Sequence, residues 1–161
     1  MANRVTIWTN SNLTGKISAT VILATYVAVH DCGTLVNPMT LAGHVRGGTA
    51  QGIGTALYER YHYDPQGQLL TASFMDYLIP TLHELPEDII VGHIETPSPF
   101  TEYGIKGGGE GGRMGAPPAV ASAVEDALRP LGVRIDTLPL TPRHLRSLIR
   151  QAQERHSAAA G

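Results

Sequence analysis

The chain has 161 residues, and its 12 lysines and arginines against 14 aspartates and glutamates give a net charge of -2. This balance excludes the basic surface of a typical nucleic-acid-binding domain, so no nucleic-acid partner is expected. Hydrophobic residues make up 42% and charged residues 16% of the chain, which is enough apolar material for a folded core and argues against extended disorder.

The cysteine and hydropathy patterns bear on the cellular compartment. Cys32 is the one cysteine of the chain, which excludes an internal disulfide and favours a reducing, cytoplasmic location. The longest apolar stretch, residues 17–29, contains hydroxyl side chains and is shorter than the roughly 20 residues of a membrane-spanning helix. No membrane span is therefore predicted.

The first predicted elements are two strands. Residues 5–8 and 17–29 are rich in the β-branched and aromatic side chains that strands prefer. Residues 10–15, between them, are polar and contain the Asn and Gly that tight turns require. The pattern predicts a β-hairpin.

A helix is predicted next, from Pro38 to about Arg60, because proline favours the first helical position. Glycine costs a helix about 1 kcal/mol per residue, and five glycines fall inside this one: Gly43, Gly47, Gly48, Gly52 and Gly54. Some further interaction must therefore stabilise the helix.

The remaining pattern alternates strands, loops and helices. Residues 61–63 and 69–72 flank an Asp-Pro-Gln-Gly turn and predict a second hairpin, and residues 89–94 predict another strand. A long loop to Ala116 should precede a helix over 117–128, and a last helix should begin at Pro142. The expected fold class is α+β: mixed sheet hairpins, about three helices and long Gly/Pro-rich loops.

A candidate catalytic residue lies in the sequence Lys-Gly-Gly-Gly-Glu-Gly-Gly of residues 106–112. Glycines allow a backbone to approach a ligand closely, and their unshielded N–H groups can hold an anion, so Glu110 is open to a bulky reactant. The alternative is a surface loop with an incidental acid. The Gly-x-Gly-x-x-Gly spacing is poor support for a dinucleotide site, because a loop rather than a strand precedes it.

Two further segments could carry chemistry. Gln51 lies in the glycine-rich helix, where small neighbours leave space for a planar ligand that uses its amide hydrogen bonds; close helix packing with a solvated Gln51 is the alternative. Residues 30–32 read His-Asp-Cys, but adjacent side chains rarely point at one ion, so no protein-ligated metal is predicted. Cys32 is interpreted as a small buried side chain at a strand end.

Several of these motifs, in this order, resemble the C-terminal part of the molybdopterin-binding subunit of the xanthine oxidase / aldehyde oxidoreductase / aerobic carbon monoxide dehydrogenase family. They are residues 26–33 (YVAVHDCG), 37–38 (NP), 47–54 (GGTAQGIG), 74–77 (FMDY), 95–99 (ETPSP), 106–110 (KGGGE) and 115–119 (GAPPA). The resemblance divides the chain into a poorly matching segment (1–14), a partial molybdopterin-binding domain (15–150) and a frayed tail (151–161).

The resemblance implies roles for individual residues. Glu110 matches the family's catalytic glutamate, a general base beside the molybdenum, and Gln51 matches the glutamine that hydrogen-bonds the pterin. The other cofactor-binding residues that it implies are Gly48, Gly52, Lys106, Gly107, Gly108 and Gly109. The dithiolene sulfurs of the cofactor would hold the metal, so no metal ligand is expected from the protein. His44 departs from the family, since many relatives have glutamine there.

The resemblance also implies partners, because related subunits are several times longer. The chain is expected to be a fragment or split subunit of a molybdenum hydroxylase acting on an aldehyde, an N-heterocycle or carbon monoxide, and to be inactive alone. The molybdopterin, for example as a cytosine dinucleotide, would be shared with a longer molybdopterin-binding chain, and iron-sulfur clusters and FAD would be carried by partner subunits. Homo-oligomerisation stays open. The alternatives are an inactive truncated relic and a non-catalytic module that binds a partner through its glycine-rich loops.

Overall fold

The computed structural model describes residues 4–11 and 17–159, which contain a three-stranded sheet in the order β1-β2-β3. Strand β1 (Arg4–Ser11) pairs antiparallel with β2 (Ile17–Asp31), and β3 (Asp88–Ile94) pairs parallel with β2. The β1–β2 pair confirms the first predicted hairpin, although residues 12–15 of its predicted turn lie outside the described residues.

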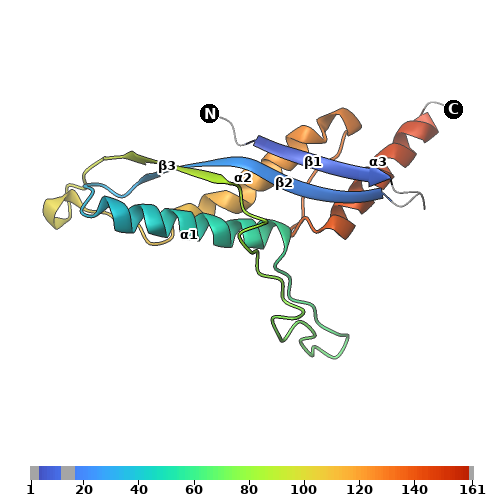
Figure 1. Cartoon of the computed structure of the whole chain (residues 1–161), viewed down its shortest axis with the longest axis horizontal. Helices are drawn as coiled ribbons and strands as arrows, with labels where there is room; N and C mark the ends of the chain where they lie inside the picture. The colour runs from blue at the N-terminus through green and yellow to red at the C-terminus, as the bar shows by residue number, and fades with distance from the viewer. Residues whose placement is uncertain (1–3, 12–16, 160–161) are drawn as a thin grey trace.

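Three α-helices accompany the sheet: α1 (Pro38–Leu57), α2 (Gly111–Ala127) and α3 (Pro142–Ala159). Two short 3-10 helices, η1 (Glu102–Gly104) and η2 (Arg129–Leu131), lie in the connections. Helix α1 runs along the sheet, and η1 and α3 lie at opposite ends of the molecule (Figure 1). The α+β class and the three helices are thus confirmed. Among the helices of the described residues, none combines the length and the hydropathy that a membrane span requires.

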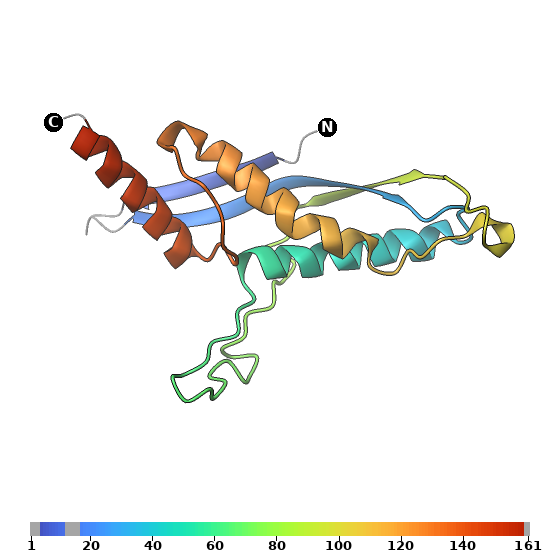
Figure 2. The ribbon, with the colours of Figure 1, turned by 180° about the vertical axis from the view of Figure 1, so that it is seen from behind.

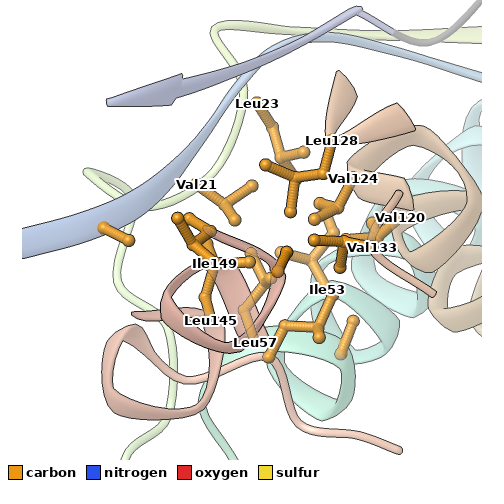
Figure 3. Close-up of a cluster of buried hydrophobic side chains, with 14 residues drawn as sticks. Val21, Leu23, Ile53, Leu57, Val120, Val124, Leu128, Val133, Leu145 and Ile149 are labelled. Atoms are coloured by element: carbon orange, nitrogen blue, oxygen red, sulfur yellow. The ribbon is translucent and has the colours of Figure 1, made fainter. Parts of the chain in front are cut away.

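The core lies where the three helices meet one face of the sheet. Along β2, Ala19, Val21 and Leu23 are buried while the residues between them are exposed, as the period of two in a strand requires. The buried β2 side chains pack against apolar side chains of α1, α2 and α3, among them Ile53, Val124 and Ile149 (Figure 3). This packing supplies the stability that the glycine-rich helices lack by themselves.

Helix α1 begins where the sequence predicts. The Asn37 side chain accepts a hydrogen bond from the Thr40 backbone N–H at 3.0 Å, and Pro38 fills the first helical position, where no N–H is needed. The helix ends at Leu57, a few residues before the expected end near Arg60.

Helix α2 begins at Gly111, so the prediction that it starts at Pro117 is wrong. Proline is common in a first helical turn, but here Pro117 and Pro118 lie inside the helix, each without an N–H to donate. The helical turn before these prolines is stabilised instead by packing on α1, because Gly112 and Ala116 of α2 lie directly against α1. This tertiary contact outweighs the local signal of the two prolines.

Residues 58–87, here called the arm, project from the body of the molecule (Figures 1 and 2). The predicted second hairpin is reduced to one isolated bridge, between Tyr63 and Leu69, and the expected strands do not form. An isolated two-stranded hairpin is marginal in water. The Asp64 side chain nevertheless shapes the turn by accepting hydrogen bonds from the backbone N–H groups of Gln66 (2.9 Å) and Gln68 (2.8 Å).

The last helix is longer than the sequence suggests. Helix α3 continues through most of the segment 151–161, for which a frayed tail is predicted. Leu145, Ile149 and Ala152 recur on one helical face and are all buried, so the packed stripe extends into this segment.

Candidate active site

Glu110 is the N-cap residue of α2 and the last residue of the glycine-rich loop, defined as residues 106–110. Its backbone carbonyl accepts a hydrogen bond from Arg113 N–H at 3.0 Å, while its side chain makes no capping hydrogen bond. The side chain is exposed. The helix therefore fixes the backbone of Glu110 and leaves the carboxylate accessible to a reactant.

The start of the glycine-rich loop is anchored to the end of β2. The Lys106 backbone N–H donates to the Cys32 carbonyl at 2.8 Å, and its Nζ lies 3.2 Å from Asp31 Oδ2. The residue before the loop, Ile105, forms a bridge with Gly33. Lys106 thus has its ammonium group in an ion pair, which makes it an anchor of the loop.

The Asp31 carboxylate accepts hydrogen bonds from three segments of the chain. Its Oδ1 accepts from the backbone N–H of Gly33 (2.8 Å) and of Thr96 (3.2 Å), and its Oδ2 pairs with Lys106. These hydrogen bonds, that from Gly33 most of all, hold the pKa of Asp31 well below its usual range. From the sequence, Asp31 is only a metal-ligand candidate, and this role is not predicted; its place at a strand end, before Cys-Gly, is the available signal.

The glycine-rich loop has one closed and one open face. A Cβ on Gly108 would lie 2.8 Å from Leu41 Cδ1 and 3.4 Å from Cys32 Cβ, so this residue packs on the body. A Cβ on Gly107 or Gly109 would meet nothing within 4 Å. The backbone is therefore unshielded on the side away from the body. A cleft of about 250 Å³ opens beside the loop; its lining includes Lys106, Gly108, Gly109 and, from α1, His44.

Close contact between α1 and α2 explains two of the glycines that were expected to bind the cofactor. A Cβ on Gly52 would lie 2.6 Å from that of Ala116, and one on Gly48 would lie 3.0 Å from the backbone nitrogen of Arg113. On α2, a Cβ on Gly112 would overlap the carbonyl oxygen of Val45. The structure thus places Gly48 and Gly52 in a helix interface, which is the packing alternative. Figure 2 shows the two helices, α1 and α2, lying against each other.

Gln51 is exposed, although its neighbour Gly52 is buried. It lines a cavity of about 300 Å³ together with Tyr77, Ile79 and Pro80 at the base of the arm. Gln51 lies three residues after Gly48, which contacts the start of α2. Three residues correspond to a rise of about 4.5 Å along a helix. Glu110 and Gln51 are therefore carried by two helices that pack together. Gln51 lines the cavity at the arm, whereas Gly108 and Gly109 of the glycine-rich loop line the separate cleft.

His30 and Cys32 form no metal site. Cys32 is buried, which confirms its interpretation as a small core side chain. Among residues 4–11 and 17–159, no group of three or more His, Cys, Asp or Glu side chains is placed to hold a metal ion. His30 lies instead beneath the glycine-rich loop, with Nε2 3.4 Å from the carbonyl oxygen of Gly107. Sequence reasoning did not reveal this contact.

The chain is similar in sequence to known proteins. The family model described as molybdopterin cofactor-binding domain matches residues 13–86. The large subunit of nicotine 6-hydroxylase from Paenarthrobacter nicotinovorans is 49% identical over 115 residues, which are 71% of this chain and 14% of that protein. The carbon monoxide dehydrogenase large chain of Afipia carboxidovorans is 41% identical over 102 residues, which are 63% of this chain and 12% of that protein.

The structural similarity is equally clear. The crystal structure of quinoline 2-oxidoreductase from Pseudomonas putida 86 matches with a TM-score of 0.79 and 48% identity, over 83% of this chain and 17% of that one. The chain thus spans a small part of the length of each of these proteins. Sequence and structure together establish that it belongs to the molybdenum hydroxylase family of xanthine oxidase, aldehyde oxidoreductase and carbon monoxide dehydrogenase, in which it matches a part of the large subunit.

Proposed function

We propose that the chain supplies the general base Glu110 and part of the pterin site to a molybdenum hydroxylase. The observation that carries this proposal is the setting of Glu110: an exposed carboxylate, free of a capping role, between an open-faced glycine loop and a helix that packs on the Gln51-bearing helix. A surface acid on a flexible loop would lack the anchors at Lys106 and Gly112.

The residues present fit a molybdopterin. Gln51 offers an exposed amide with two donors and an acceptor, and Gly107 and Gly109 leave the loop backbone unshielded toward a flat ligand. When bound, the cofactor supplies the redox and oxygen-transfer chemistry. In this assignment Gln51 and the loop backbone hold the pterin, Lys106 fixes the loop, and Gly48 and Gly52 act through helix packing.

Glu110 has the properties of a general base. Its backbone is fixed by the first turn of α2, and its side chain makes no cap hydrogen bond, so a carboxylate oxygen is available to accept a proton in the reaction. Docking of a larger chain over the open side would exclude water from the carboxylate and strengthen its interactions with the reactants.

The substrate class is proposed from the relatives. Nicotine and quinoline, which appear in the names of the hydroxylase and the oxidoreductase, are both nitrogen heterocycles, and these two proteins are 49% and 48% identical to this chain. They favour an N-heterocycle over an aldehyde or carbon monoxide. The chain itself would contribute the proton-accepting carboxylate and no complete substrate pocket.

The proposed partner is a longer molybdopterin-binding chain, because this chain matches only 14% of the nicotine 6-hydroxylase large subunit. Iron-sulfur and FAD subunits are proposed as the electron carriers of that complex. The arm supports such a partner because Phe74, Met75 and Leu82 are 81%, 89% and 87% exposed. Exposed apolar side chains in this number are typical of an interface.

A segment exchange tests the function. This chain would replace the matching segment of quinoline 2-oxidoreductase, and quinoline turnover would be compared between the exchange enzyme and its Glu110→Gln variant. A general base is worth about 100-fold or more, so we expect a loss of at least that size in kcat. Glu102→Gln removes an exposed carboxylate in η1 and should leave turnover unchanged. A loss of less than about tenfold for Glu110→Gln would contradict the proposal.

A further inference from the structure

His30, the second-to-last residue of β2, packs its ring against the first residue of α2. A Cβ built on Gly111 would overlap Nδ1, Cε1 and Cγ of His30, so a larger residue next to Glu110 would have to displace the ring. The imidazole thus occupies the volume that a side chain at position 111 would need.

The same ring also touches the beginning of the glycine-rich loop. Its Nε2 lies 3.4 Å from the carbonyl oxygen of Gly107, and a Cβ on Gly108 would lie 4.0 Å from that nitrogen. His30 therefore contacts residues on both sides of Glu110 in the sequence, Gly107 in the loop and Gly111 at the start of α2. The other anchors act at the loop's ends: Lys106 binds β2, and Gly112 packs on α1.

We infer that His30 is a positioning residue that sets the conformation of the glycine-rich loop and thereby the place of Glu110. Glycine has the largest conformational freedom of any residue, and Gly107, Gly108 and Gly109 precede Glu110 without a side chain to restrict them. The rigid ring of His30, which is held by β2, contacts the loop and restricts the conformations of these glycines. The catalytic significance of this inference rests on the proposed function of Glu110, whereas the contact between His30 and the loop is independent of that proposal.

A double-mutant cycle on the 161-residue chain tests the ring contact. Hydrogen exchange of the Arg113 and Met114 amides, which donate to the Glu110 carbonyl at 3.0 and 3.4 Å, would be measured for the wild type, His30→Ala, Gly111→Ala and the double variant. His30→Ala should accelerate exchange of these amides about tenfold and leave the buried α3 amides unchanged. Gly111→Ala should accelerate it in the wild type but not in the His30→Ala background, where the methyl group has room.

Two controls separate the ring contact from general effects. Gly115→Ala lies in the same helix, where a Cβ meets nothing within 4 Å, so its effect should be equal in both backgrounds. His93→Ala removes the partly buried histidine that pairs with His30 across the sheet, and should not accelerate exchange of these amides. His30→Phe keeps the ring and should hold exchange within about threefold of wild type, which also covers the case in which His30→Ala fails to fold.

The hydrogen-exchange rates of these variants either support or overturn the positioning role of His30. Equal effects of Gly111→Ala in the two backgrounds, or equal acceleration by His93→Ala and His30→Ala, would overturn the inference. In the segment exchange enzyme, His30→Ala should lower kcat more than it raises KM, and His30→Phe should restore it. If Glu110→Gln leaves quinoline turnover of the segment exchange enzyme unchanged, the proposed function fails. The hydrogen-exchange rates still decide whether His30 positions the loop.

Discussion

Asp31 shows how one carboxylate can order a site that it does not line. Its oxygens bind Gly33 in the same turn, Thr96 after β3 and Lys106 at the start of the glycine-rich loop. These partners are 2, 65 and 75 residues away in the sequence. The loop that carries Glu110 is therefore fixed to the sheet through a charge at the end of β2.

The lowered pKa of Asp31 predicts a pH dependence. A carboxyl group whose pKa is lower in the folded state stabilises the fold fully above its unfolded pKa of about 3.9, and this contribution is lost as the pH falls below that value toward the folded pKa. Asp31→Asn should therefore be less stable than the wild type near neutral pH, and the difference should shrink on acidification.

Urea unfolding from about pH 6 to about pH 2 measures this difference. Asp88→Asn, at an exposed aspartate at the start of β3, serves as the matched control and should show no comparable difference from the wild type. A constant gap between the wild type and Asp31→Asn across this range would show that the Asp31 charge contributes nothing.

At the scale of elements, the crossing of α1 and α2 determines where both candidate residues lie. Gly48 and Gly52 on one helix face Gly112 and Ala116 on the other, so the two backbones approach without intervening side chains. Spacing of four residues puts each pair on one helical face. The approach places the helix that begins after Glu110 directly on the helix that carries Gln51.

Adding a methyl group at Gly112 should separate the helices. Its Cβ would overlap the Val45 carbonyl oxygen, a backbone atom that cannot rotate away, so Gly112→Ala should lower the free energy of unfolding by about 1–3 kcal/mol. Gly115→Ala, in open space on the same helix, should raise it by up to about 1 kcal/mol through helix propensity. Urea unfolding followed by circular dichroism compares the two, and equal stability of both variants would refute the close approach.

The elements differ in how far the sequence predicts them. The β-branched and aromatic composition of residues 17–29 and the Asn37-Pro38 signal predict β2 and the start of α1 because the information is local. The start of α2 at Gly111 is not predictable in this way, since its stability comes from contact with α1. For the same reason, sequence alone could not decide whether Gly48 and Gly52 serve packing or a ligand, whereas the isolated position of Glu110 among glycines was visible directly.

At the scale of the whole molecule, the apolar surface is concentrated away from the core. The core is built from side chains of β2 and the three helices, whereas the arm extends outward from the body (Figure 1). Phe74 and Met75 are among its most exposed side chains. A domain that folds around its helices but leaves an apolar arm in water is expected to bind a partner there.

The arm should therefore be required for assembly and dispensable for folding. The matching chain of quinoline 2-oxidoreductase, with its corresponding segment deleted, would be mixed with this chain and the affinity measured. Phe74→Asp with Met75→Asp should weaken binding at least about tenfold, because large apolar side chains dominate interface energies and a buried charge is costly. Gln66→Ala, at the exposed polar tip of the same arm, should bind as the wild type does. Unfolding midpoints of all variants should agree, since exposed positions contribute within about 0.5 kcal/mol to stability; unchanged binding of the double variant would exclude the arm as the contact surface.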